Sequence, residues 1–167
     1  MKTLLISMLT LVFGLTYSMA ALAGPGHDSK HSGHKEMPAM DKQQMAVVSV
    51  MKAYSAAINT EEVAVMENLV MADGTDFTIF EGSGKNIGWA DYRDHHLIPE
   101  FEMVELVFSK YEYTNIKSTV SGDMAFATFA IDIAYTYKGE AKTKKGNGTA
   151  VLRLVDGQWK MTHLQTS

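Results

Sequence analysis

Residues 156–167 read DGQWKMTHLQTS, and this stretch carries the clearest structural pattern of the chain. Asp156 and Gly157 form a dipeptide that two-residue hairpin turns prefer, because such turns need positive φ angles. The residues after the turn alternate between two faces, as they do in a β-strand. The large side chains share one face, which we expect to point inward, and they are Trp159, Met161, His163 and Gln165.

Three more strands are predicted before this one. Apolar residues alternate over 107–120, 124–137 and 149–155, and turn sequences around Gly122 and Gly139 follow the first two. The stretch 124–137 is poor in charge on both faces, whereas a strand with one solvated face carries polar residues there. We therefore expect the outer face of the sheet to meet a second subunit, which makes the protein a homodimer.

Three helices are predicted upstream of these strands. Over 42–59 the apolar residues recur at intervals of three and four, after an N-capping aspartate. A second helix is predicted over 61–71 with Thr60 as its N-cap. A third is predicted over 89–97, with its end or a kink at Pro99.

A short strand over 76–81 and a glycine-containing loop over 82–88 are predicted between the second and third helices. Helices that precede a series of antiparallel strands are typical of an α+β fold. The sequence therefore predicts one α+β domain over 42–167.

The domain resembles the SnoaL-like branch of the nuclear transport factor 2-like superfamily. Two passages carry the resemblance: the DGQWK hairpin that leads into the strand with His163, and the helix GWADYRDHHLIP over 88–99. The resemblance implies a cone-shaped, curved antiparallel sheet packed on three N-terminal helices, with an internal pocket. Its members include isomerases, cyclases, dehydratases and binding domains without catalytic activity, so this fold does not give the function.

A cavity between a curved sheet and a helix is lined by the inward side chains of both. On spacing alone, the predicted third helix and last strand contribute five ligand-pocket residues: Trp89, Tyr92, His96, Trp159 and His163. Aromatic walls with one or two imidazoles suit a flat or amphipathic small molecule.

His96 and His163 are the candidate catalytic residues. An imidazole beside a carboxylate can act as a general base or contribute to a metal site, and Glu81 and Glu100 are the candidate acids. The alternative is a histidine that only satisfies a backbone carbonyl or orients a ligand. Ketosteroid-isomerase relatives of the superfamily use pocket Asp and Tyr side chains, and residues of these types here are Tyr111, Tyr113 and Asp132.

The N-terminus has the three parts of an export signal. Lys2 supplies the positive charge, and the apolar run from Leu4 ends in the small-x-small pattern that closes at Ala23. We expect cleavage to remove residues 1–23, which makes the protein periplasmic or secreted. The alternative is an uncleaved membrane anchor, but polar residues interrupt the run. No later segment of the sequence is long and apolar enough to span a membrane.

Residues 24–41 read GPGHDSKHSGHKEMPAMD and are predicted to be a flexible linker, because they offer little apolar surface to bury. Imidazole and thioether side chains are copper ligands, and imidazole also binds zinc. The candidate metal ligands in this segment are His27, His31, His34, Met37 and Met40. The alternative is a solvated spacer that binds no metal.

The composition of the 167-residue chain excludes several classes of function. It contains no cysteine, so it can form no disulfide, iron–sulfur cluster or thiol nucleophile, and its net charge of −4 gives no support for nucleic-acid binding. Three functions stay open. They are binding of a small apolar or amphipathic ligand, an isomerase, dehydratase or cyclase reaction with a pocket histidine as base, and binding of copper or zinc.

Overall fold

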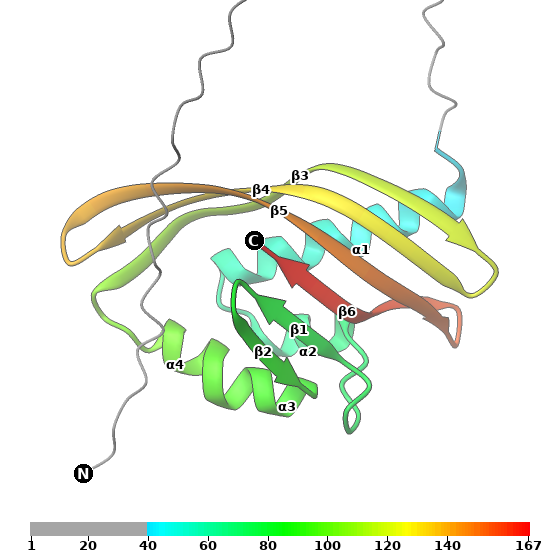
Figure 1. Cartoon of the computed structure of the whole chain (residues 1–167), viewed down its shortest axis with the longest axis horizontal. Helices are drawn as coiled ribbons and strands as arrows, with labels where there is room; N and C mark the ends of the chain where they lie inside the picture. Colours follow the sequence, from blue (N-terminus) through cyan, green and yellow to red (C-terminus); the bar gives the residue numbers. More distant parts are fainter. Residues whose placement is uncertain (1–39) are drawn as a thin grey trace, which may run out of the picture. The chain divides into compact units, whose positions relative to one another are not determined.

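A six-stranded sheet in the order β2-β1-β6-β5-β4-β3 organises residues 40–167, the part of the chain that the computed structural model describes (Figure 1). Neighbouring strands pair antiparallel, except that β1 and β6 run parallel. The strands are β1 (Thr78–Glu81), β2 (Gly84–Ile87), β3 (Leu106–Ser121), β4 (Met124–Tyr137), β5 (Glu140–Val155) and β6 (Gln158–Thr166).

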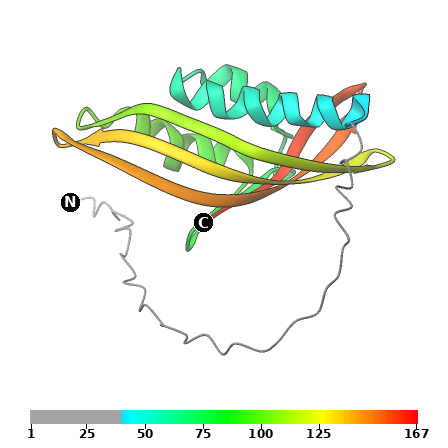
Figure 2. The ribbon, with the colours of Figure 1, turned by 90° about the horizontal axis from the view of Figure 1, so that it is seen from above.

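The helices are α1 (Lys42–Asn59), α2 (Val63–Leu69), α3 (Trp89–Tyr92), η1 (Arg93–Leu97) and α4 (Ile98–Phe101). The last three follow one another without a break and make one continuous helical segment. In Figure 1 the long strands β3, β4 and β5 arch over α1, and Figure 2 shows α1 running along them on one side of the sheet. None of the helices between residues 40 and 167 is long and apolar enough to cross a membrane.

Helix α1 is fixed at its N-terminus and packed along one stripe. Asp41 and Gln44 form a reciprocal capping box, with contacts of 2.8 and 2.9 Å. The indole Nε1 of Trp159 on β6 donates a 2.9 Å hydrogen bond to the side chain of Gln43. The stripe that faces the sheet includes Val47, Met51, Tyr54 and Ile58, all buried. These contacts make the face of the sheet that meets α1 the inner face of the domain.

Three sequence-based boundaries need correction. Strand β5 begins at Glu140 rather than at residue 149. The prediction started too late because the first half of the strand lacks the apolar alternation by which a strand is recognised in a sequence. The predicted loop over 82–88 contains β2, a short edge strand. Thr60 is the C-cap of α1 and not the N-cap of α2. Its hydroxyl donates a 2.6 Å hydrogen bond to the Glu62 carboxylate, and α2 starts at Val63 with Glu62 as its N-cap.

A β-bulge in β6 changes which residues point inward. His163 pairs with Val151 of β5, but Met161 pairs with the next residue, Leu152, so Thr162 is the extra residue. Met161 is fully buried on the inner face, whereas His163 lies on the outer face of the sheet. The expectation that His163 shares a face with Trp159 is therefore wrong, because simple alternation does not continue through a bulge.

The helical segment after β2 continues past Pro99. Its middle part, η1, is a π-helical turn, the wider turn in which backbone hydrogen bonds join residues five apart. Pro99 has no N–H to donate to the preceding turn, and the π turn precedes it directly. Gly88 starts the segment with φ +96°, and a side chain there would meet the Gly74 carbonyl at 2.7 Å. The position of Gly88 therefore fixes where the helical segment starts, and His96 lies about two turns further along it.

Candidate functional site

The inner face of the sheet holds a buried carboxylate, that of Glu81. This residue ends β1, and its side chain is only 25% exposed. His96 on η1 places Nε2 3.1 Å from Glu81 Oε2 and 3.8 Å from Glu100 Oε2. Two carboxylates from different elements therefore meet around one imidazole.

Burial raises the pKa of Glu81 to about 7. Lys144 on β5 and a hydrogen bond from Tyr92 act in the opposite direction but are weaker than the cost of desolvation. The pKa of Glu100 is also raised, first by burial, with His96 lowering it and Glu81 raising it further. A carboxyl group with a pKa near 7 can both take up and release a proton at neutral pH.

Four tyrosines surround this carboxylate: Tyr54 on α1, Tyr92 on α3, and Tyr111 and Tyr113 on β3. Burial raises the pKa of each phenol, and the nearby charge of Glu81 adds to the effect. All four phenols are therefore protonated at neutral pH and can donate hydrogen bonds.

Several buried polar atoms of this region lack a well-formed hydrogen bond within residues 40–167. They are Tyr54 Oη, Tyr113 Oη, Trp89 Nε1 and Glu81 Oε2. Buried polar groups in folded proteins nearly always have a protein, water or ligand partner. The cluster therefore offers both donors and an acceptor to a small polar guest.

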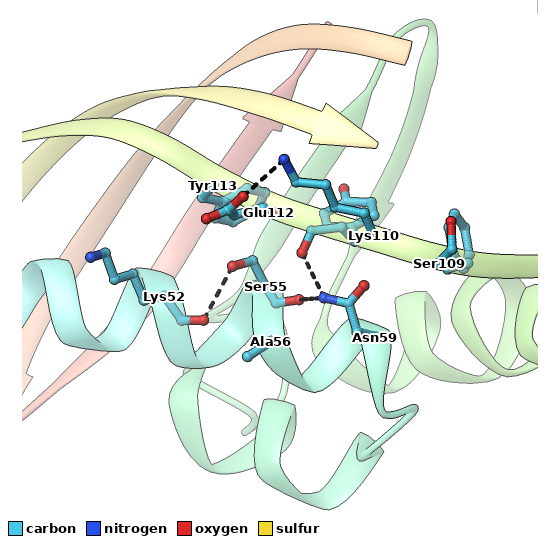
Figure 3. Close-up of a pocket in the computed structure, with 10 residues that line it drawn as sticks. Lys52, Ser55, Ala56, Asn59, Ser109, Lys110, Glu112 and Tyr113 are labelled. Atoms are coloured by element: carbon cyan, nitrogen blue, oxygen red, sulfur yellow. Dashed lines mark hydrogen bonds and ion pairs between the residues drawn. The ribbon is translucent and has the colours of Figure 1, made fainter. Parts of the chain in front are cut away.

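A groove of about 410 Å³ runs between α1 and β3 (Figure 3). Its floor and walls include Ser55 and Asn59 of α1 and the β3 residues Phe108, Tyr111 and Tyr113. Asn59 donates a 2.7 Å hydrogen bond to the Tyr111 carbonyl, which fixes the helix against the strand. Tyr111 and Tyr113 belong both to the groove and to the cluster around Glu81. The groove has the size of a small-molecule site and shares these two tyrosines with the polar cluster.

The chain matches the sequence profile of the SnoaL-like domain over residues 47–167. The chain belongs to the SnoaL-like domain family. Its predicted fold class, an α+β cone built from a curved sheet and three helices, is confirmed by solved structures of the nuclear transport factor 2-like superfamily. The chain matches no curated protein sequence.

Three solved structures illustrate the similarity. A nuclear transport factor 2-like superfamily protein from Salmonella enterica has a TM-score of 0.63 at 16% identity, over 74% of this chain and 88% of its own. A putative ketosteroid isomerase from Shewanella frigidimarina has 0.60 at 25% identity, over 73% and 94%. A ketosteroid isomerase-like protein from Erwinia carotovora has 0.63 at 20% identity, over 77% and 97%. The first and third of these show the fold alone.

The SnoaL-like domain brings together three of the five predicted pocket residues. Trp89, Tyr92 and His96 follow one another along the helical segment, and the rings of Tyr92 and His96 stack with centroids 5.2 Å apart. Trp89 and Tyr92 are nearly fully buried, whereas His96 is partly exposed at the edge of the cluster.

The other two predicted pocket residues lie elsewhere. Trp159 is buried and bonds to Gln43 at the N-terminal end of α1. Tyr54 lies in the second half of α1 and Glu81 at the end of β1, so Trp159 is not part of their cluster. His163 lies on the outer face, where its Nδ1 is 2.7 Å from the Thr78 hydroxyl and its ring meets Phe80 edge-on. The structure therefore does not place the His163 imidazole beside His96.

The proposed metal ligands His27, His31, His34 and Met37 lie outside the described residues, and Met40 is exposed at their start. Within residues 40–167, no group of three or more histidine, aspartate and glutamate side chains is arranged to hold a metal ion.

Asp132 is not part of the cluster. Its carboxylate lies on the outer face, 3.6 Å from Lys145 and 3.8 Å from Lys110. Tyr54 belongs to the cluster but was not among the predicted site residues, because it fits the apolar period of the first helix. Its phenol was hidden because tyrosine at a buried helix position also fits simple core packing.

Proposed function

We propose that the SnoaL-like domain is an isomerase-type enzyme that moves a proton on a small amphipathic substrate, with Glu81 as the general base. The observation that carries this proposal is the buried Glu81 carboxyl, with a pKa of about 7, beside His96 and four phenols. A base with a pKa near the working pH is efficient in both directions of proton transfer. The similar structure from Shewanella frigidimarina is that of a putative ketosteroid isomerase, which agrees with this class of reaction.

The reaction needs no co-reactant. Glu81 removes a proton from a carbon next to a substrate carbonyl. The electron pair of the broken C–H bond forms a C=C bond to the carbonyl carbon, and the π pair of the C=O bond moves onto the oxygen. A phenol such as Tyr54, which lacks a hydrogen-bond partner within residues 40–167, donates to that oxygen. Glu81 then delivers a proton, which can have exchanged with solvent, to the γ-carbon of a β,γ-unsaturated substrate or back to the original carbon. His96 lies against the carboxylate and orients it.

The test is exchange of the benzylic protons of phenylacetone for deuterium, followed by proton NMR. We expect Glu81→Gln to lower the exchange rate roughly 10²- to 10⁴-fold, the usual contribution of a general base. Asp132→Asn is the matched control, because it makes the same chemical change on the outer face. Equal rates for the wild type and Glu81→Gln contradict the proposal.

Binding without turnover is the second candidate function. It is favoured by the groove of about 410 Å³, which falls in the range of small-molecule sites regardless of chemistry. The two functions separate in one experiment. A protein that binds phenylacetone but exchanges its protons no faster than buffer is a binding protein, and the enzyme proposal then fails.

The homodimer is proposed through the outer face of the sheet. The register aligns one row of outer-face side chains across all six strands: Thr119, Phe126, Val151, His163, Thr78 and Ile87. Phe126 is 48% exposed and Ile87 49%, and these large apolar side chains in an uncharged row suit a subunit interface. Sedimentation equilibrium of the wild type and Phe126→Asp tests it, since a charge at this position dissociates a dimer joined there.

Export and metal binding by the N-terminal segment are proposed on the sequence alone. The small-x-small pattern before Gly24 supports cleavage and a periplasmic or secreted location. Three histidines and two methionines over 27–40 support copper or zinc binding. The mass of the protein from its native host checks the cleavage, and metal titration before and after deletion of residues 24–40 checks the binding.

A further inference from the structure

Lys144 on β5 lies on the inner face of the sheet, opposite the groove residue Tyr111. Strand β5 pairs with β4 without a bulge, so Lys144 shares a face with the buried residues Ala150 and Leu152. Lys144 pairs with Ile133, and Ile133 pairs with Tyr111. Two strand spacings of about 4.8 Å put the Lys144 backbone roughly 10 Å from that of Tyr111, a distance that a small molecule can span.

The other lysines of this hairpin are already engaged. Lys142 lies 3.4 Å from Glu140 and Lys145 lies 3.6 Å from Asp132. Lys138 stands over the ring of Tyr137, 5.2 Å from its centroid. Within residues 40–167, Lys144 makes no such ion pair, although it is close enough to Glu81 to lower the pKa of that carboxyl. Among the described residues it is therefore an inner-face positive charge without an ion-pair partner of its own.

The two carboxylates of the site, Glu81 and Glu100, do not neutralise the positive charge of Lys144. Glu81 and Glu100 both face His96, and both are buried enough to favour their protonated forms more than exposed carboxyls do. The exposed Lys144 side chain keeps its long flexible stem, so its ammonium can follow a ligand at the mouth of the site.

We propose that Lys144 is the specificity-determining residue that binds a carboxylate of the substrate, which makes the substrate class small amphipathic keto acids. The proposal rests on the proposed function of the same site. The apolar body lies among Phe108, Tyr111 and Ile133, the carboxylate meets the Lys144 ammonium, and the acidic carbon faces Glu81. A keto acid with an apolar body has these three parts in that order.

The test compares two probes that differ in one group, phenylpyruvate and its neutral analogue phenylacetone, in which a methyl group replaces the carboxylate. Dissociation constants come from calorimetry, and an NMR titration of the His96 ring shows that the probe occupies this site. We expect the wild type to prefer phenylpyruvate on the order of fivefold, the size of a partly solvated charge contact, and added salt to reduce that preference.

Lys144→Gln should abolish the preference, and Lys145→Gln, one residue along on the outer face, should leave it unchanged. Both lysines are exposed, so both variants keep the fold. Equal affinity of the wild type for the two probes, or a preference that survives Lys144→Gln, overturns the proposal. Failure of the enzyme proposal has a different signature. The wild type and Glu81→Gln then exchange protons at the same rate, whatever the difference in affinity between the two probes.

Discussion

The two faces of the sheet place the same kind of side chain in opposite environments. On the inner face, Glu81 is buried among phenols, and its pKa rises to about 7. On the outer face, Asp132 lies between Lys110 and Lys145, and its charge is balanced by lysines that reach solvent. The difference follows from strand alternation and from helix α1, which covers only the inner face.

This contrast teaches that residue type alone does not identify the reactive acid in the domain. A paired carboxylate at the surface is stable as an anion and has little tendency to accept a proton. A buried carboxylate has lost hydration, so proton uptake relieves the cost of its charge. The chemistry of the domain is therefore expected on the inner face, and substitutions on the two faces should have different consequences.

Among substitutions that leave Glu81 intact, the largest effect is expected for Tyr54→Phe. Loss of one hydrogen-bond donor to a developing oxyanion lowers a rate by roughly 10²- to 10³-fold. Stability should fall little, because the Tyr54 hydroxyl has no well-formed hydrogen bond among residues 40–167 and the neighbouring Tyr92 hydroxyl still has the Glu81 carboxylate as an acceptor. Proton exchange and thermal unfolding measure the two effects.

Tyr135→Phe is the matched control for that experiment, since Tyr135 is half-buried toward the end of β4 and lies beside Phe108 rather than Glu81. An unchanged exchange rate in Tyr54→Phe would show that this phenol does not contact the reacting oxygen. A loss of stability would show that the hydroxyl has a partner in solution.

The second effect is a pH dependence of stability that Glu81→Gln removes. The folded state binds the Glu81 proton with a pKa of about 7, against 4.5 for an ordinary glutamate. Stability from this group is therefore complete below pH 4.5 and declines as the pH rises through 7, by roughly 3 kcal/mol at most. Glu81→Gln should be more stable than the wild type at pH 8 and not at pH 4.5.

Denaturant unfolding at the two pH values measures this difference, with Asp132→Asn as the control on the outer face. Because Asp132 is a partly exposed ion-pair partner, its loss should cost about 1 kcal/mol or less. A wild type and Glu81→Gln that respond alike to pH would show that Glu81 is solvated in the folded protein.

Most of the fold could be predicted from the sequence because its strands and α1 follow simple periods. Dipeptide Asp156-Gly157 and the alternation after it located the last hairpin, and the interval of three and four located α1. The first half of β5 was missed because its inner positions are occupied by Lys142, Lys144, Gly146 and Gly148 rather than by apolar residues. Both lysines are exposed, so this half of the strand carries no apolar alternation that a sequence pattern could detect.

The site was predicted only in part, for two physical reasons. Glu100 could be proposed beside His96 from helix spacing, with Glu81 of the predicted strand as the other candidate acid, and the structure brings these three together. His163 was placed on the wrong face because the bulge at Thr162 leaves no mark in the sequence pattern. The long-range meeting of Tyr54 with Glu81 depends on how α1 crosses the sheet, which no local period reports.

The smallest effect is expected for His163→Ala, which tests the outer position of this residue. The variant should lose about 1 kcal/mol of stability at pH 8, because the 2.7 Å contact with Thr78 and the packing on Phe80 disappear. Burial lowers the pKa of His163 below 6.5, so the folded state resists its protonation. The stability that this residue contributes is present above pH 6.5 and is lost as the pH falls, so the difference in stability between wild type and variant should narrow at low pH.

Proton exchange tests the same position independently. It should stay at the wild-type rate in His163→Ala and drop in His96→Ala, and a comparable drop in both variants would place His163 in the site after all.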